Sequence, residues 1–170
     1  VETNEKQRFS LKEDDQGILR IRANQGHSTT AVQVAQASVT CVQSEKLLQP
    51  LLDPSKFPYC IHGTDYSSWQ KIQQSGGLSR MNRTHVHFAS QPFGSKQMIS
   101  GMRKNCEVLI HLDLAAAILG GLKFYLSDNR VILCEGDARG MVSANYFARV
   151  ERLNRGTGMF AELALTLPAT

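Results

Sequence analysis

The stretch Tyr59-Cys60-Ile61-His62-Gly63-Thr64, followed by Asp65 to Gln74, decides the fold class of this chain. The first part is a short apolar run, which predicts a strand that ends at His62-Gly63-Thr64. The second part predicts a helix, because Thr64 or Asp65 can cap its start and Gly76-Gly77 can stop it. Whether such strands belong to a parallel or an antiparallel sheet depends on the segments around them.

Short strand-like segments lie on both sides of this unit. Before it, Arg8 to Leu11 and Ile18 to Arg22 are separated by turn residues, which predicts a hairpin. After it, strands are predicted at His85–Ala89, Glu107–Leu112, Lys123–Leu126, Arg130–Cys134 and Val142–Val150. Polar and apolar residues alternate within these segments, unlike the continuous apolar runs of a buried parallel sheet. The pattern therefore favours an antiparallel or mixed sheet in an α+β domain with short helices.

The remaining segments are less regular. Asp113 can cap an Ala-rich helix, Cys41 to Leu52 is weakly helical, and residues 94–104 are expected to form a short helix. From residue 156 the chain is rich in Gly, Ala and Thr, which predicts a flexible tail over residues 156–170. The length of 170 residues suits one domain, which we expect to occupy residues 1–155.

Composition and charge exclude several classes of protein. A content of 42% hydrophobic and 20% charged residues is typical of an ordinary globular protein, and no run approaches the ~18 apolar residues of a membrane span. The four cysteines form no Cys-x-x-Cys pair, so we expect no metal site, reduced thiols and an intracellular location. The net charge of +4 permits an anionic partner without requiring one.

An arginine ends the second hairpin strand in the stretch Ile21-Arg22-Ala23-Asn24-Gln25-Gly26-His27-Ser28. The small, polar and glycine residues that follow it cannot build a core. A guanidinium offers a planar fork of donors, and the side chains of Gln25, His27 and Ser28 add further polar groups. The stretch is therefore suited to hold a phosphate or another anion, and the alternative is a polar turn after a strand.

Two further groups of residues are candidates for a binding site. Gly63 lets a ligand approach the backbone closely, and the amides at the start of the following helix can bind a polar group. Arg83, His85 and His87 share one side of a predicted strand, because strand side chains repeat every two residues. Three such groups are poor core material, so we expect that side to meet water or an anion. Arg103 can close on the same anion as the hairpin arginine, although its spacing does not require it.

In their order along the chain, several motifs resemble the tRNA 2′-phosphotransferases. They are Gln7-Arg8-Phe9, Ile21 to Ser28, His62-Gly63-Thr64, Gly77 to Phe88, Arg103, Val108 to Asp113, Asn129 to Leu133 and Tyr146-Phe147. The resemblance implies an ADP-ribosyltransferase-like fold, in which a split, mostly antiparallel sheet holds NAD in a cleft, and a location in the cytoplasm or nucleus. It also implies a two-step reaction. An internal 2′-phosphate of RNA attacks C1″ of NAD and expels nicotinamide, and the O2″ hydroxyl then attacks that phosphate to give ADP-ribose 1″,2″-cyclic phosphate and 2′-OH RNA.

The resemblance further implies roles for individual residues. Arg22 and Arg103 are expected to be catalytic, and Arg22 is expected to grip the 2′-phosphate together with Gln25, His27 and Ser28. The residues expected to bind NAD are His62, Gly63, Thr64, Gly77, Leu78, Arg83, His85, His87 and Val131. These roles agree with the chemistry, since a migrating phosphate dianion and an oxocarbenium-like sugar need fixed cations and a dry, preorganised pocket.

The resemblance also implies an N-terminal, winged-helix-like lobe with an Arg-His pair needed for catalysis. This sequence contains no Arg-His dipeptide, so we expect that lobe to be absent from this chain. We therefore expect the chain to bind NAD with weak or no transferase activity. Separately, we expect a monomer. Three alternatives remain open. An ADP-ribosyltransferase acting on protein or on a nucleic-acid end phosphate would use Glu135. A phosphodiesterase with two His-x-Thr/Ser motifs would find only His62-Gly63-Thr64, and a non-catalytic RNA-binding module rests on positive charge alone.

Overall fold

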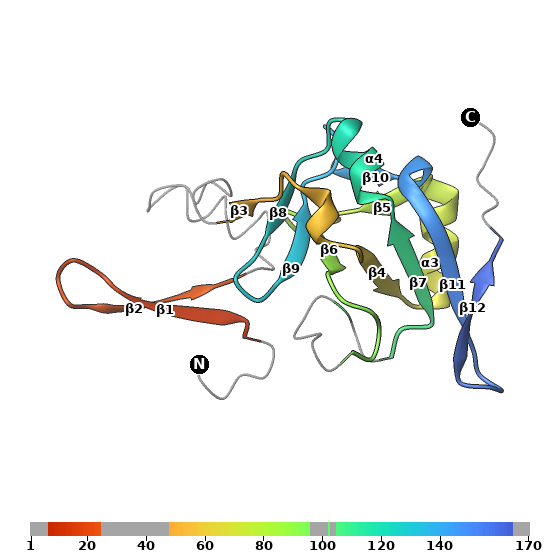
Figure 1. Cartoon of the computed structure of the whole chain (residues 1–170), viewed down its shortest axis with the longest axis horizontal. Coiled ribbons are helices and arrows are strands. Elements are labelled where there is room, and N and C mark those ends of the chain that lie inside the picture. Colours follow the sequence, from red (N-terminus) through yellow and green to blue (C-terminus); the bar gives the residue numbers. More distant parts are fainter. Residues whose placement is uncertain (1–6, 25–47, 96–101, 103–104, 165–170) are drawn as a thin grey trace.

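The computed structural model describes residues 7–24, 48–95, 102 and 105–164, and of Arg22 only the backbone (Figure 1). Its main element is an eight-stranded sheet with the order β12-β11-β7-β4-β6-β9-β8-β3. These strands are β3 (Gln49–Pro50), β4 (Ile61–Thr64), β6 (Val86–Ala89), β7 (Val108–Leu112), β8 (Phe124–Leu126), β9 (Val131–Cys134), β11 (Phe147–Asn154) and β12 (Met159–Leu163). Every described strand pair is antiparallel. The prediction of an α+β fold with a mostly antiparallel sheet is confirmed.

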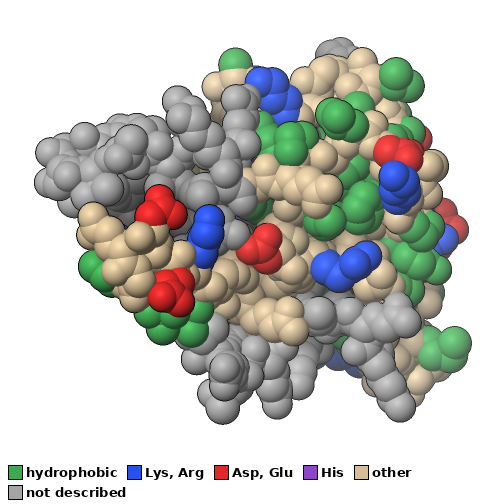
Figure 2. All heavy atoms as spheres, turned by 60° about the vertical axis from the view of Figure 1, so that its left-hand side comes forward, with side chains coloured by type: hydrophobic (Ala, Val, Ile, Leu, Met, Phe, Trp, Pro, Cys, Tyr) green, Lys and Arg blue, Asp and Glu red, His purple; other side chains and the backbone are tan. Residues whose placement is uncertain are grey.

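Two smaller sheets complete the described strands. β1 (Phe9–Glu13) and β2 (Leu19–Ala23) form the predicted hairpin, which projects away from the main sheet (Figure 1). Its large apolar side chains are exposed. β5 (Gly77–Ser79) pairs with β10 (Met141–Ser143), a short pairing that was not predicted. Seen from the side of the hairpin, basic and acidic side chains lie interspersed among apolar ones, and neither sign of charge dominates (Figure 2).

Two helices lie where the sequence predicts them. α3 (Tyr66–Ser75) begins after Asp65, whose side chain accepts a hydrogen bond from Ser68 N, and ends at Gly76 with a φ of 73°. α4 (Leu114–Leu119) begins after Asp113 in the same manner. Single 3₁₀ turns are formed by Pro54–Lys56 and Ala144–Tyr146. In the described part of the chain no helix is both long enough and apolar enough to span a bilayer.

The main core joins one face of the sheet to the two helices. Trp69 of α3 is 1% exposed and lies with its ring 6.4 Å from that of Phe147, and Phe88 at the centre of the sheet is fully buried. The opposite face of the sheet carries two smaller apolar clusters, one of them centred on Ile61 and Leu109. Cysteines 60, 106 and 134 are buried, as the sequence predicts. Burial therefore divides the sheet into a helix-covered face and a less covered face.

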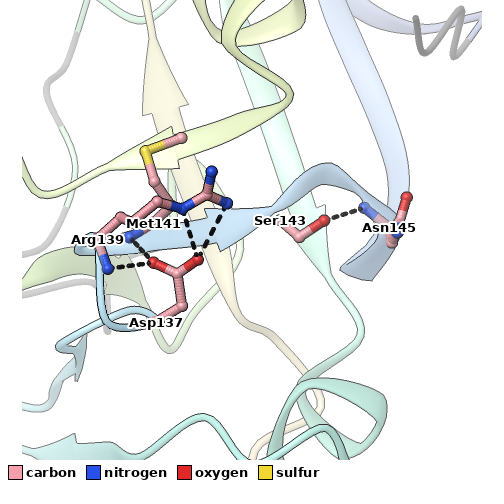
Figure 3. Close-up of polar contacts among 5 residues, drawn as sticks. All are labelled: Asp137, Arg139, Met141, Ser143 and Asn145. Atoms are coloured by element: carbon pink, nitrogen blue, oxygen red, sulfur yellow. Dashed lines mark hydrogen bonds and ion pairs between the residues drawn. The ribbon is translucent and has the colours of Figure 1, made fainter. Parts of the chain in front are cut away.

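Three segments differ from expectation. The predicted flexible tail includes β12, since the Asn154 side chain accepts a hydrogen bond from Gly156 N and turns the chain back onto β11. The single strand predicted at Val142–Val150 is interrupted, because Ser143 Oγ accepts a hydrogen bond from Asn145 N at 3.2 Å and starts a 3₁₀ turn (Figure 3). Within the weakly helical prediction at Cys41–Leu52, Gln49–Pro50 form β3, which pairs with β8. Most of the predicted helix at 94–104 lies outside the described residues.

Two carboxylates hold the start of α3. Asp65 Oδ1 accepts a hydrogen bond from Ser68 N at 2.8 Å, and Glu107 Oε2 accepts one from Tyr66 N at 3.0 Å. The Ser67 hydroxyl, followed by the amide of Ser68, lowers the pKa of Asp65 well below its usual range. The Tyr66 amide, followed by a neighbouring arginine, lowers the pKa of Glu107. Both carboxyls are therefore bound more tightly by the fold when they are ionised.

We predict that acid destabilises this corner of the fold. A carboxyl whose folded-state pKa is lowered contributes its full stability above its ordinary pKa and loses it as the pH falls through the lowered value. The contribution of these two carboxyls to the free energy of unfolding in urea should therefore be nearly constant from pH 7 to about pH 5 and fall below that. Asp65→Asn and Glu107→Gln should each flatten the acid slope. An acid slope unchanged by either α3 variant would contradict the assignment.

Candidate active site

The main sheet is split between β4 and β6. These strands share a single residue pair, Ile61 with Ala89. On their other edges the pairing is continuous, since β4 pairs with β7 along all four of its residues and β6 pairs with β9 in the same way. Beyond Ile61 the sheet therefore separates into two halves. Gly63 and Thr64 lie on one side of the separation, and Val86 and His87 lie on the other.

His62 bridges the two halves where the backbone ladder stops. Its Nδ1 lies 2.9 Å from the carbonyl oxygen of His87, and its ring meets the Phe88 ring edge-on at 5.9 Å. A carbonyl only accepts hydrogen bonds, so Nδ1 carries the proton and donates it. The contact replaces a ladder hydrogen bond with one from a side chain. It fixes both the orientation of the imidazole and the separation of the strands at this point.

His85 and His87 share one side of β6 and its approach, as predicted, but their surroundings differ. His87 is half-buried, whereas His85 is only 5% exposed. The Nδ1 of His85 lies 2.8 Å from the Thr84 hydroxyl, its Nε2 lies 3.8 Å from Glu135 Oε1, and its ring packs edge-on against Tyr125. The expectation that this side of the strand meets water or an anion is wrong at His85, which is buried. Tyr125 of β8 and Glu135 of the loop after β9 lie against it.

Gly63 brings a further segment onto the split. A Cβ at this position would lie 2.4 Å from Met102 Cγ and 2.5 Å from Cys106 Sγ, so only glycine fits. Met102 is 7% exposed and belongs to the apolar cluster around Ile61. It directly precedes Arg103, which itself lies outside the described residues. The absence of a side chain at Gly63 thus explains how Met102 packs directly on β4.

We predict that Gly63→Ala destabilises the protein by about 1–3 kcal/mol, the usual cost of overpacking a filled site. Urea unfolding should show this as a lower midpoint with an unchanged slope. Gly156→Ala is the matched control. Its new Cβ would meet only the Asn154 Oδ1, at 3.3 Å, so its effect should stay within about 0.5 kcal/mol. Equal stabilities for the two variants would show that Met102 does not pack as described.

Three other residues predicted to bind NAD are packed against neighbouring strands or within the core. A Cβ on Gly77 would lie 2.3 Å from the Val142 carbonyl oxygen, so glycine is required by the β5–β10 pairing. Leu78 is 2% exposed in the main core. Val131 is fully buried and packs in one cluster with Tyr125 and Leu133 on the face that also carries His87. Their packing shapes the split, and contact of these residues with NAD stays a prediction.

The residues predicted to hold the RNA phosphate are described only in part. The backbone of Arg22 pairs with Ser10 in the hairpin, and Ser10 Oγ lies 3.2 Å from Asp128 Oδ2 in the turn between β8 and β9. The hairpin strand that carries Arg22 is thus tied to the sheet through its partner strand. Gln25, His27 and Ser28 lie outside the described residues.

Sequence reasoning missed two side chains that support the site. Tyr125 covers His85, and Met102 packs on β4 at Gly63. Neither carries a motif, and only the strand order brings them to the split. The His62 ring lies on the helix-covered face of the sheet against Phe88, whereas His85 and His87 lie on the face that carries Tyr125 and Leu133. The split thus has imidazoles on both of its faces, and imidazoles suit the sugar hydroxyls and amide group that a dinucleotide such as NAD presents.

The fold and site define an antiparallel α+β domain with a histidine-bridged split, and comparisons with known proteins identify its family. The chain matches the RNA 2′-phosphotransferase, Tpt1 / KptA family over residues 1–136. It is 41% identical to tRNA 2′-phosphotransferase 1 of Danio rerio over 155 residues, which cover 90% of this chain and 64% of the relative. For tRNA 2′-phosphotransferase 1 of Mus musculus the identity is 42% over 156 residues, with 90% and 57% covered. For tRNA 2′-phosphotransferase of Saccharomyces cerevisiae it is 36% over 135 residues, with 78% and 55% covered.

The chain therefore belongs to the RNA 2′-phosphotransferase family, which confirms the family predicted from its motifs. It spans less than two thirds of the length of each of these three relatives.

Proposed function

We propose that this chain is the NAD-binding part of an enzyme that removes an internal 2′-phosphate from RNA, with spliced tRNA as the substrate, and transfers it to ADP-ribose. One observation carries the proposal. The split between β4 and β6 brings His62 and His87, both predicted to bind NAD, into direct contact. Membership of the family and the names of the relatives support the RNA substrate.

The residues of this chain bind and orient the reactants. NAD supplies the C1″ electrophile and the nicotinamide leaving group. The hydrogen bond to His87 holds the His62 ring in one orientation before the ligand arrives, which lowers the entropic cost of reaching the reactive geometry. Arg22 and Arg103 are proposed to hold the 2′-phosphate and to stabilise its charge as it changes partners. These two roles follow from the family motifs.

The test is analysis of products after incubation with NAD and a synthetic oligonucleotide that carries one internal 2′-phosphate. We expect nicotinamide, 2′-OH oligonucleotide and ADP-ribose 1″,2″-cyclic phosphate, all dependent on NAD. Enzyme in excess and single-turnover conditions reveal a slow reaction. The matched control is the same oligonucleotide without the 2′-phosphate. Phosphate release without NAD would contradict the proposal, as would consumption of NAD that leaves every 2′-phosphate in place.

A second candidate function is favoured by the position of Glu135. Its Oε1 lies 3.8 Å from His85 Nε2 beside the split, where a carboxylate can activate an acceptor group. This arrangement suits transfer of ADP-ribose to a protein or to a nucleic-acid end phosphate. The same product analysis separates the two functions, because this second activity leaves ADP-ribose attached to the acceptor and forms no cyclic phosphate.

A further inference from the structure

Two loops meet at the open end of the split. Arg80–Thr84 connect β5 with the approach to β6, and Glu135–Gly140 connect β9 with β10. The backbone N–H of Arg80 donates to the Gly140 carbonyl oxygen at 3.0 Å. β4 contacts β6 only near Ala89, at the far end of β6, so the loop before β6 lies where the two strands have separated. The two loops form one rim beside the site of the proposed reaction.

Arg80 is held in place on this rim. Gly140 has a φ of 74°, and a Cβ there would lie 2.3 Å from Arg80 Nε, so the side chain of Arg80 occupies the space that glycine leaves. Arg80 Nη1 donates to the Arg83 carbonyl oxygen at 3.2 Å. One of the five N–H groups of the guanidinium is thereby used for anchoring. Arg80 is half-buried, and Arg83 beside it is exposed.

The two acids of the second loop, Glu135 and Asp137, lie against groups other than Arg80 and Arg83. Asp137 accepts hydrogen bonds from the backbone N–H groups of Arg139 and Met141 at 2.9 Å, and its other oxygen lies 3.3 Å from Arg139 Nη2 (Figure 3). Glu135 faces His85. Within the described ranges, neither Arg80 nor Arg83 forms an ion pair with a carboxylate. Among the described residues, the rim thus presents two guanidinium groups that no carboxylate neutralises by an ion pair.

We propose that Arg80 and Arg83 form a docking site for the phosphodiester backbone of the RNA substrate. The inference rests on the proposed function and assigns Arg83 to RNA, in place of the NAD role that the family resemblance implies. Guanidinium groups match phosphate oxygens in charge and in the geometry of their donors. The four steps along the chain from Arg83 to His87 span at most about 13 Å, the length of a fully extended segment. RNA carries phosphates on both sides of the reacting nucleotide, so one of them can reach this rim.

The test measures equilibrium binding of a fluorescent single-stranded oligonucleotide with one internal 2′-phosphate, by anisotropy over a series of salt concentrations. Arg80→Gln and Arg83→Gln should each weaken binding about tenfold at low salt. Each should also reduce the slope of log affinity against log salt by about 0.7. Arg139→Gln is the matched control, since Arg139 lies in the adjacent loop but is paired with Asp137. Calorimetry should give an unchanged affinity for NAD in all three variants, and their melting temperatures report on folding.

Four results would overturn the docking site: no RNA binding by the unmodified protein, unchanged RNA binding by both variants, an equal loss in Arg139→Gln, or a loss of NAD affinity in place of RNA affinity. The last result would assign the two arginines to the phosphates of NAD. Failure of the proposed reaction can be distinguished from failure of the docking site, because RNA binding does not require turnover. RNA binding that depends on Arg80, in a protein that forms no cyclic phosphate, would retain the docking site and reject the reaction.

Discussion

Replacing His62 with alanine is expected to weaken NAD binding by about tenfold to a hundredfold, which corresponds to about 1.4–2.8 kcal/mol. The imidazole bonds β4 to β6 across the split, through its Nδ1 and the His87 carbonyl oxygen. Without it, the two halves of the sheet are free to change their separation, and the ring is no longer available to a ligand. Loss of the hydrogen bond should also lower the free energy of unfolding by about 1 kcal/mol. Calorimetry with NAD and urea unfolding measure the two effects.

Two further variants test whether the loss of NAD affinity depends on the split. His62→Asn keeps an N–H donor near the position of Nδ1 and should recover part of the lost stability and NAD affinity. His111→Ala removes a histidine of β7 that pairs with Ile61 at the closed end of the split and whose Nε2 lies 2.6 Å from Glu151 Oε2 on β11. It should cost stability without changing NAD affinity. If His111→Ala weakened NAD binding as much as His62→Ala, the split would not be the binding site.

Replacing Arg103 with alanine is expected to slow removal of the 2′-phosphate by about 10²–10³-fold under single-turnover conditions. The phosphate is a dianion that forms a bond to C1″ in the first step and to O2″ in the second. A fixed cation lowers the activation free energy most where the charge of that phosphate is desolvated. Met102, the residue directly before Arg103, packs on β4 at Gly63. This packing fixes the position from which the chain continues to Arg103. NAD affinity should change little, because this role concerns the phosphate.

The control for Arg103 is Lys104→Ala, which removes the same charge from the next residue along the chain. We expect it to leave the rate within about threefold of the unmodified protein, because the sequence gives Lys104 no role beyond its charge. Arg103→Lys should recover part of the activity, since a lysine restores the charge without the planar fork. Equal rate losses for Arg103→Ala and Lys104→Ala would point to general attraction of RNA and contradict a catalytic role for Arg103.

The elements that the sequence predicts best are those with local signals. α3 has a capping Asp65 and a terminating Gly76, and both act in the structure as the sequence suggests. β12 was missed because the Gly, Ala and Thr residues around it predicted a flexible tail, and it forms by pairing with β11 after a turn at Asn154. The β5–β10 pair was missed because each strand has only three residues. In both cases the deciding partner lies outside the segment itself.

In the site, too, features set by one segment could be predicted from the sequence, and features set by contacts between distant segments could not. The strand end at His62-Gly63-Thr64 and the alternation of His85 with His87 are visible in the sequence. The bridge from His62 to β6 is not, because it depends on β4 and β6 being neighbours that separate after one residue pair. The burial of His85 was also missed, since Tyr125 reaches it from β8 and Glu135 from the loop after β9.

The most direct test of the account is a titration of the isotopically labelled protein with NAD, followed by its backbone amide signals. If NAD binds in the split, the largest shifts should come from Gly63 and Thr64 on β4 and from Val86 and His87 on β6, and the residues of β12 should stay unchanged. These shifts should weaken or vanish in His62→Ala. Saturating NAD that leaves all four amides unchanged, or that shifts only signals remote from the split, would contradict the central claim.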